Sequence, residues 1–377
     1  MITPTLHSVT DPELWNLVET TVSATDLAHV LRIVADAPAP SGMATLTRGT
    51  AIRAWWEDRV GESSASVYES DVARSGCDTI SLGDGGIRLF AHIDEVSYLI
   101  RRPTADPLVW QVTAYCYHLA TRPAPARVVR VTASGAVSVI GSGEIYEDDG
   151  HIYYRTPDAN GICPGDRIAL FSPLAVDASH GLTTGSLDNA AGVAGCLIAG
   201  IVLEKLAIPF SIALTDEEEG PSGQSSQTIS RGAARLCSTI EPASLSVAID
   251  IHGLSDAERT ASEDHRLPWG ASLAESSSSG RGSVAPPQLL AGAMDLLAGV
   301  HEQGVRSRLN VGGYVPRSDD VVAMLHSNRV LILGYPGINR HFDEGLPSVN
   351  LHDLVELAKA LIVLAVGVHT GELAVDW

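Results

Sequence analysis

Lysine is almost absent from this chain: Lys205 and Lys359 are the only two among 377 residues. Arginine therefore carries nearly all of the positive charge, and we do not expect a lysine to act in catalysis. Acidic residues outnumber basic ones by 45 to 25, which gives a formal net charge of −20. Nucleic acids and anionic membranes both require a basic face on a protein that binds them. The sequence therefore argues against both as partners.

Cysteine is also scarce. The chain has five cysteines, an odd number, and no two of them have C-x-x-C spacing. This pattern does not favour a thiolate zinc site or a framework of disulfides. We expect reduced cysteines that pack as small core residues.

Two kinds of hydrophobic segment are missing. No apolar run reaches the length of a membrane span, and the longest candidate, Leu354 to Val368, has helical spacing and contains two charged residues. The first residues, Met1 to His7, lack a basic region followed by an apolar stretch. No signal peptide is therefore predicted, and we expect a cytoplasmic protein.

Hydrophobic residues make up 45% of the chain and charged residues 19%, which is typical of a globular protein. Residues 1–97 and 177–377 combine apolar strand patterns with helical spacing. Residues 98–176 instead contain short β-patterned runs separated by Gly and Pro clusters. The sequence predicts an α/β fold, an open mixed sheet flanked by helices, with an inserted small β-barrel domain. Residues 1–97 and 177–377 would form the catalytic domain, and 98–176 would form the insert.

Individual elements follow from the same patterns. Helical spacing predicts helices near 13–36, 44–59, 190–206, 286–303 and 353–370, and apolar alternation predicts strands near 78–82 and 87–92. Residues 252–285 are polar and rich in Ser and Gly. Their composition is typical of a flexible linker, whereas a long loop inside a compact domain is more often part of an active site.

Two histidines and three carboxylates follow predicted strands or the loops after them. These five residues are His92, Asp188, Glu218, Asp250 and His341. In an open α/β sheet, ligands gather at the carboxyl ends of the strands. Imidazole and carboxylate groups that converge there match the needs of two hydrolytic metal ions. The sequence therefore predicts a metal-dependent enzyme.

Two short motifs support this prediction. His92-Ile-Asp94 lies at a strand end, and Asp94 could accept a hydrogen bond from the second nitrogen of a metal-bound imidazole. Alone, this pattern is more typical of a surface pair. Asp188-Asn189 opens a helix of small residues, which places an acid beside a helix N-terminus. An aspartate that bridges two cations is the natural chemical use of that position.

Four consecutive acids, Asp216 to Glu219, end another apolar strand. They repel one another, so they indicate either a solvated charged loop or a site where a cation removes the repulsion. Adjacent glutamates can divide the work in such a site, because one can bind metal while its neighbour moves a proton.

The order of these motifs resembles that of the dinuclear-metal aminopeptidases of the glutamyl aminopeptidase and tetrahedral aminopeptidase type. The resemblance covers most of the chain. The motifs that carry it are Ala37–Gly42, Ala91-His-Ile-Asp-Glu95, Pro164-Gly-Asp166, Leu187-Asp-Asn189, Ala191-Gly-Val193, Asp216-Glu-Glu-Glu-Gly220, Ala248-Ile-Asp250, Arg317-Ser-Asp-Asp320 and His341.

The resemblance implies a set of metal ligands. His92, Asp188 and Asp250 would hold one divalent ion, most plausibly zinc or cobalt. Asp188, Glu218 and His341 would hold the second, with Asp188 as the bridge. The resemblance also implies a PDZ-like insert used in assembly, so a homo-oligomer is expected, possibly a dodecamer.

The resemblance further implies that N-terminal residues are removed from peptides through a hydroxide that bridges the two metal ions. Glu217 would be the general base, and Asp94 would orient His92. The Asp188–Asn189 peptide would be a candidate for a cis bond.

The chain departs from the family pattern in several places. Glu219 stands where relatives usually carry an apolar residue, Asp320 replaces a small residue, and the region after His341 is longer. These changes leave open an amidase or deacylase that acts on a small metabolite. A non-catalytic assembly protein on the same scaffold is a weaker alternative.

Three residues are candidates for substrate binding: Arg340, Asp319 and His252. The planar guanidinium of Arg340 could hold a substrate carboxylate, although a structural salt bridge is the alternative. His252 follows Asp250 closely and is a possible extra ligand or a supporting group.

Overall fold

The computed structural model describes residues 6–221, 229–262 and 268–375. Its α-helices are α1 (Pro12–Thr21), α2 (Ala24–Asp36), α3 (Thr50–Val60), α4 (Ala190–Leu206), α5 (Arg231–Cys237), α6 (Asp256–Ser262), α7 (Pro287–Gly299), α8 (Asp319–His326) and α9 (Leu351–Thr370). A π-helical segment, η1 (Thr45–Gly49), precedes α3, and short 3-10 turns occur at η2 (Val72–Arg74), η3 (Ser278–Gly280) and η4 (His301–Gln303).

The strands are β1 (Val67–Glu69), β2 (Asp78–Leu82), β3 (Ile87–His92), β4 (Ser97–Pro103), β5 (Val109–Ala114), β6 (Ala124–Val131), β7 (Val137–Asp148), β8 (His151–Arg155), β9 (Arg167–Leu170), β10 (Ala175–Val176), β11 (Leu182–Thr184), β12 (Phe210–Thr215), β13 (Leu245–Gly253), β14 (Ala271–Ala274), β15 (Ser307–Leu309), β16 (Val330–Ile338) and β17 (Ser348–Asn350).

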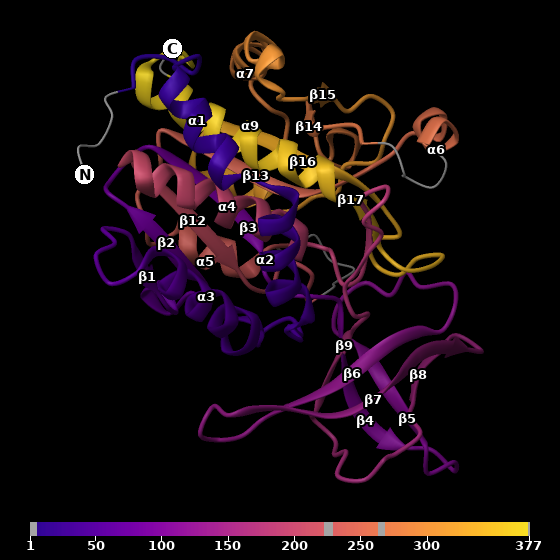
Figure 1. Ribbon diagram of the computed structural model, residues 1–377. Helices are drawn as coiled ribbons and strands as arrows, with labels where there is room; N and C mark the ends of the chain where they lie inside the picture. Colours follow the sequence, from indigo (N-terminus) through magenta and orange to yellow (C-terminus); the bar gives the residue numbers. More distant parts are fainter. Residues whose placement is uncertain (1–5, 222–228, 263–267, 376–377) are drawn as a thin grey trace.

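The main body is one mixed sheet flanked by helices (Figure 1), as the sequence predicts. Within the described ranges it has eleven strands in the order β1-β2-β12-β3-β13-β16-β17-β11-β10, and β14 and β15 extend from β16. The four central strands, β12, β3, β13 and β16, are parallel. Because parallel strands are covered on both faces, their sequences are almost continuously apolar. Their carboxyl ends meet at one edge of the sheet.

Side chains that alternate along β3 show how the two faces are covered. Leu89 and Ala91 pack in the large core formed with α2, α4 and α9, whereas Phe90 points to the opposite face and packs with α5 and α8. This follows from the two-residue period of a strand. Among the described residues, no helix has both the length and the apolar character needed to cross a bilayer.

Helix α4 forms the centre of the large core. Fifteen of its 17 residues are buried, as expected for a helix that is apolar all round. Glycines let its neighbours approach closely: a Cβ at Gly195 would lie 2.9 Å from Cδ2 of Leu357, and one at Gly200 would lie 2.9 Å from Cδ1 of Ile212. The sheet and α9 therefore fix the position of α4, and with it the residues just before its first turn.

Strands β4 to β9 form a closed barrel in the order β4-β5-β8-β7-β6-β9. The barrel is inserted after β3 and projects from the main body (Figure 1). It has its own core, which includes Tyr98, Val128 and Ile145. Phe342, from the loop after β16, packs against this core. The small inserted β-barrel that the sequence predicts is thus present and contacts the main body beside that loop.

Candidate metal centre

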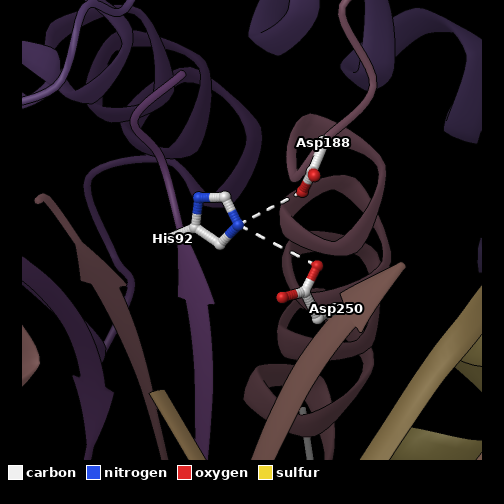
Figure 2. A group of neighbouring side chains, drawn as sticks. All are labelled: His92, Asp188 and Asp250. Carbon is white, nitrogen blue, oxygen red and sulfur yellow. Dashed lines mark ion pairs between the residues drawn. The ribbon is translucent and has the colours of Figure 1, made fainter. Parts of the chain in front are cut away.

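The parallel strands bring three of the candidate residues to one edge of the sheet. His92 is the last residue of β3 and is in register with Thr215, the last residue of β12. Asp250 lies in β13, the neighbour of β3 on its other side. His341 follows the end of β16. Asp188 comes from the main-chain segment that leads into α4. Figure 2 shows one nitrogen of the His92 ring facing both Asp188 and Asp250.

Asp188 lies between the two histidines. Its Oδ1 is 3.3 Å from Nε2 of His92, and its Oδ2 is 3.4 Å from Nε2 of His341. On the His92 side, Nε2 is also 3.9 Å from Oδ1 of Asp250. On the His341 side, Nε2 is 2.8 Å from Oε1 of Glu219. The candidate ligand atoms of each group lie within 4.8 Å of one another, so two groups of ligands share one carboxylate.

The side chain of Asn189 holds the start of α4 in place. Its amide donates to the carbonyl oxygen of Ile249 at 2.6 Å, and its Oδ1 accepts from the hydroxyl of Tyr335 at 2.9 Å. The Asp188–Asn189 peptide is cis, as the family resemblance implies. Contacts to β13 and β16 therefore fix the residue that follows Asp188.

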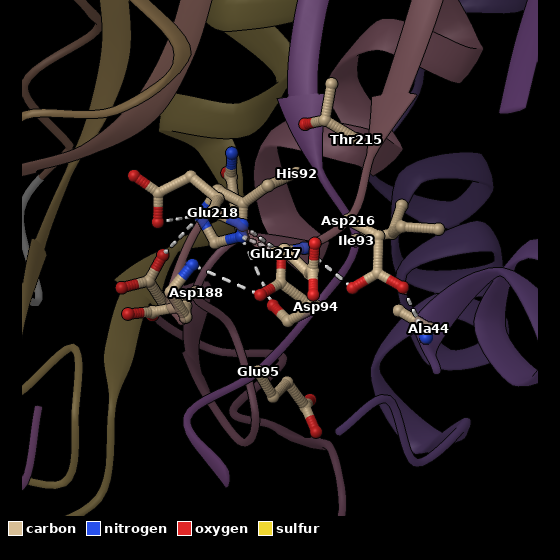
Figure 3. Close-up of polar contacts among 12 residues, drawn as sticks. Ala44, His92, Ile93, Asp94, Glu95, Asp188, Thr215, Asp216, Glu217 and Glu218 are labelled. Carbon is tan, nitrogen blue, oxygen red and sulfur yellow. Dashed lines mark hydrogen bonds and ion pairs between the residues drawn. The ribbon is translucent and has the colours of Figure 1, made fainter. Parts of the chain in front are cut away.

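Two buried aspartates organise the acidic segment at the end of β12 (Figure 3). Asp216 accepts hydrogen bonds from the backbone amides of Gly42 and Ala44 at 2.8 and 2.9 Å. Asp94 accepts from the backbone amides of Glu218 and Glu219, both at 3.1 Å. The Nδ1 of His92 lies 3.2 Å from the carbonyl oxygen of Asp94 and 3.6 Å from its Oδ1. Asp94 thus contacts both the histidine and the acidic segment.

The three glutamates of this segment point to different places. Oε2 of Glu218 lies 3.9 Å from Nε2 of His92, and the carboxylate of Glu219 lies beside His341. His92, Glu218 and Glu219 form a third group of candidate ligands, and the carboxylate of Glu217 is absent from all three groups found among the described residues. It contacts the hydroxyl of Tyr115 at 2.9 Å and Nη1 of Arg235 at 2.7 Å.

The structure places the five residues predicted from the sequence close together, and Glu219 joins them. Glu219, and not Glu218, shares a group with Asp188 and His341. Sequence reasoning treated Glu219 as a departure near the substrate pocket. The signal that could have identified it was the extra acid itself, because a buried acid in place of an apolar residue requires a cationic partner.

Charges are strongly coupled across the cluster. Burial, reinforced by the charge of Asp188, raises the pKa of Asp250 to about 8. Burial opposes the protonation of His341, but the charge of Glu219 and the contacts with Asp188 and Glu219 together outweigh it and raise the pKa of His341 to about 9. Burial would raise the pKa of Asp188, yet the neighbouring imidazoles of His341 and His92 lower it. Protons on the histidines therefore supply positive charge that divalent cations could supply instead.

Unsatisfied buried atoms test whether metal ions fit this site. Neither oxygen of Asp188 and neither ring nitrogen of His341 has a hydrogen-bond partner in the described part of the chain, although all four atoms are buried. Buried polar atoms normally have partners. Imidazole nitrogens and carboxylate oxygens are also the donors that zinc and similar divalent ions accept. The residues fit two ions that share Asp188.

The three candidate substrate-binding residues occupy different environments. Arg340 borders a small cavity of about 10 Å³ together with Asp188, Glu219 and His341. No carboxylate of the described residues pairs with it, and its guanidinium lies 5.7 Å from the centre of the Tyr314 ring. Asp319 and His252 are instead 1% and 0% exposed.

Hydrogen bonds tie the two buried residues to neighbouring strands. Asp319 accepts from the hydroxyl of Thr215, and Nδ1 of His252 lies 3.1 Å from the hydroxyl of Ser272. Burial, together with the charge of Arg308, lowers the pKa of His252 to about 3. Of the three candidates, only Arg340 borders the cavity beside the cluster.

Comparison with known proteins identifies the fold. No family model and no curated protein matches the sequence. Among solved structures, the TET1 peptidase of Pyrococcus horikoshii is 19% identical, with a TM-score of 0.65 over 90% of this chain and 99% of the other. An aminopeptidase from Desulfurococcus kamchatkensis is 18% identical, with a TM-score of 0.66 over 90% of this chain and 95% of the other.

A third structure, a TET aminopeptidase from a marine sediment archaeon of the Thaumarchaeota, is 14% identical, with a TM-score of 0.70 over 91% of this chain and 96% of the other. The chain has the fold of these aminopeptidases. Because the likeness covers nearly the whole of each chain, it includes both the sheet and the inserted barrel. At this level of identity it establishes the architecture, and the argument for an activity rests on the residues of the cluster.

Proposed function

We propose that this protein is a dinuclear metal-dependent aminopeptidase that removes N-terminal residues from peptides. The observation that carries the proposal is the position of Asp188, with one carboxylate oxygen toward His92 and the other toward His341. Further carboxylates complete a group of ligands on each side. The likeness of fold to known aminopeptidases supports the same function.

Two sets of ligands share Asp188 in this proposal. His92, Asp188 and Asp250 hold one ion, and Asp188, Glu219 and His341 hold the other. Zinc and cobalt suit these nitrogen and oxygen donors. When bound, two such ions act as Lewis acids toward the scissile carbonyl group and lower the pKa of water.

Glu218 is the general base of the proposed mechanism. Its carboxylate lies beside His92 and Glu219 and outside the two sets of ligands that share Asp188. Glu218 takes a proton from the attacking water and then returns it to the amine of the leaving peptide. Asp94 positions this residue, because it accepts a hydrogen bond from the Glu218 amide and also contacts the ring of His92. The assignment differs by one residue from Glu217, which the family resemblance implies.

Arg340 provides the substrate contact in this proposal. Its guanidinium borders the cavity beside the ligands and forms no ion pair with the described residues, so it is available for a substrate carboxylate. Asp319 and His252 support the site from within the core, because both are buried and hydrogen-bonded to neighbouring strands.

The proposal extends to organisation and assembly. Residues 1–97 and 177–377 form the catalytic domain, and 98–176 form a PDZ-like insert that mediates self-association into a homo-oligomer in the cytoplasm. The similar TET1 peptidase of Pyrococcus horikoshii can assemble into a tetrahedron or a large octahedral shell, and another structure of this type is a dodecamer. Light scattering at several protein concentrations measures the assembly of this chain.

The decisive test of the proposed activity combines metal analysis with hydrolysis of aminoacyl-p-nitroanilides before and after chelation. We expect about two metal ions per chain and cleavage that chelation abolishes and added metal restores. A parallel panel of N-acyl compounds tests for a deacylase. If the protein binds two metal ions but cleaves only N-acyl compounds, it is a deacylase and not an aminopeptidase. If it binds no metal, the remaining alternative is a non-catalytic protein.

A further inference from the structure

Glu217 begins the glutamate run but turns away from the ligands. Its backbone φ is +58°, in the left-handed region, whereas Glu218 and Glu219 are not among the residues with positive φ. This conformation is uncommon for a residue other than glycine. The side chain of Glu217 contacts the inserted barrel.

The partner that Glu217 meets in the insert is Tyr115. This residue directly follows β5, and its hydroxyl donates to Oε1 of Glu217 at 2.9 Å. Burial, with the hydrogen bond to Glu217, raises the pKa of Tyr115 to about 12, so the phenol remains a donor at neutral pH. The guanidinium of Arg167, at the start of β9, lies 4.6 Å from the centre of the Tyr115 ring and supports it from behind.

The ring of Tyr115 also packs on the far end of the same segment. A Cβ at Gly220 would lie 2.6 Å from Cδ1 of Tyr115 and 2.9 Å from Sγ of Cys116. Tyr115 thus contacts the side chain of Glu217 and the backbone at Gly220. Glu218 and Glu219 lie between these two points of contact.

A second anchor holds Glu217 from the catalytic side. Arg235, on α5, pairs with Oε2 of Glu217, and its Nε donates to the carbonyl oxygen of Ser75 at 2.6 Å. Both oxygens of Glu217 are therefore occupied, one by each part of the molecule. The exposed fractions of the Glu217 and Arg235 side chains are 17% and 44%. A partly shielded ion pair of this kind contributes to positioning more than to stability.

We propose that Tyr115 and Glu217 are positioning residues that form a latch, through which the inserted barrel fixes the orientation of Glu218 and Glu219 toward the metal site. The inference rests on the proposed function, because it assigns to the insert a part in the metal chemistry of the main body. The latch acts by keeping the acidic segment in one conformation before metal binds. Loss of this ordering lowers metal affinity and also misplaces the base.

The experiment compares Tyr115→Phe and Glu217→Gln with the wild-type protein. Tyr115→Phe keeps the ring over Gly220 and removes only the hydroxyl. The matched control is Tyr153→Phe, a tyrosine of the same barrel whose ring stacks on Tyr146. Zinc affinity is measured by competition with a chromophoric chelator. The visible absorption of the cobalt-substituted protein reports the geometry of the ligands, and kcat and KM are measured at saturating metal.

We expect both variants to bind zinc about tenfold more weakly, as is typical when a group that orients metal ligands is removed. The cobalt spectrum should change in both, kcat should fall with little change in KM, and Tyr153→Phe should match the wild type. Circular dichroism and thermal unfolding establish that each variant is folded. A second variant, Arg235→Leu, acts on the opposite anchor and should shift the cobalt spectrum in the same way.

Other outcomes would overturn the latch. Glu217→Gln with unchanged metal affinity and spectrum, but without turnover, would make Glu217 the general base. Wild-type affinity and spectrum in both variants would exclude any positioning role. If the wild-type protein binds two ions but cleaves no peptide, the proposed aminopeptidase activity is wrong. The latch is still tested by the zinc affinity and by the cobalt spectrum. If it binds no metal, both proposals fail.

Discussion

At the scale of single residues, the acidic segment after β12 shows that neighbours of the same type take different roles. Asp216 accepts hydrogen bonds from the segment before η1, Glu217 faces the barrel, and Glu218 and Glu219 face the ligands. The backbone differs in the same way, because Glu217 alone among the four has a positive φ. Substitutions that preserve the shape of each side chain can therefore separate their functions.

The first prediction separates a ligand from a base. Glu219→Gln should reduce the metal content from about two ions per chain toward one, since it removes the charge beside His341. Glu218→Gln should keep most of the metal but lower kcat by about 100-fold or more, as expected for loss of a general base. Metal analysis of dialysed protein and steady-state kinetics measure the two effects. Full activity of Glu218→Gln with metal bound would rule out Glu218 as the base.

The second prediction concerns Arg340. Arg340→Gln should raise KM by about tenfold or more for substrates that carry a carboxylate near the scissile bond, because it removes a charged hydrogen-bond partner. KM for neutral aminoacyl-p-nitroanilides should change little. Arg122→Gln, at an exposed position on the insert, is the control. An equal rise in KM for neutral and acidic substrates would contradict the proposed contact.

His92, Asp250 and His341 could be predicted as candidate ligands from the sequence, because each lies in an apolar strand or in the loop after one. The roles of Glu217, Glu218 and Glu219 could not be assigned from the sequence. They depend on a left-handed residue and on a tyrosine about a hundred positions away in another part of the chain. No local pattern encodes either feature.

At the scale of secondary-structure elements, α4 shows the strongest link between sequence and site. Its predicted range, 190–206, agrees with the structure, because a continuous run of small and apolar residues has no competing interpretation. The predicted helix near 13–36 is instead two helices. Ser23 interrupts it and accepts a hydrogen bond from the amide of Asp26 at the start of α2. A side chain that caps a helix is a signal that apolar spacing does not reveal.

Short strands were the hardest elements to predict. Strand β14 lies within the Ser- and Gly-rich stretch 252–285, yet it pairs with β16. Its residues, Ala271 to Ala274, include no β-branched or aromatic side chain, so the usual strand signal is absent. The stretch is therefore part of the sheet at this point and not simply a flexible linker, while residues 263–267 lie outside the described ranges.

The third prediction tests the packing at the start of α4. A Cβ at Gly192 would lie 2.2 Å from Oδ1 of Asn189 and 3.0 Å from Cγ2 of Ile249. A methyl group at position 192 would clash with the side chain of Asn189, which two hydrogen bonds hold in place. Gly192→Ala should therefore displace Asn189 together with the adjacent Asp188. Such overpacking typically costs about 1–3 kcal/mol, and metal affinity should fall as well.

Gly299→Ala, at the end of α7, is the control, because a Cβ there would meet no atom within 4 Å. Chemical denaturation and zinc titration measure both variants. Unchanged stability and affinity in Gly192→Ala would contradict the packing argument.

At the scale of the whole molecule, the buried charges make stability depend on pH. Burial raises the pKa of Glu95 from 4.5 to about 7 and, with the charge of Asp188, that of Asp250 from 3.8 to about 8. At pH values between the unfolded and the folded pKa of each group, the native state binds more protons than the unfolded state. The stability of the fold therefore falls as pH rises through this range. The raised pKa of His341, from 6.5 to about 9, acts in the same direction: its contribution is complete below pH 6.5 and is lost as pH rises through 9.

The fourth prediction follows from this decrease of stability with rising pH. The metal-free protein should unfold at a higher temperature at pH 6 than at pH 8.5. Saturation with zinc should reduce or reverse the difference, because metal ions replace the protons on the histidines and the buried carboxyl groups. Scanning calorimetry at both pH values, with and without zinc, measures the effect. Equal unfolding temperatures in the metal-free protein would contradict it.

The late position of α9 in the chain has a consequence for biosynthesis. Helix α4 packs against α2, from the beginning of the chain, and against α9, from its end. The ligands are similarly spread from His92 to His341. A growing chain on the ribosome therefore carries an apolar, uncovered α4 until α9 has emerged. It cannot complete the metal site before His341 has emerged. Truncation just before α9 should yield an aggregation-prone nascent product that depends on chaperones, even though every candidate ligand has already been translated.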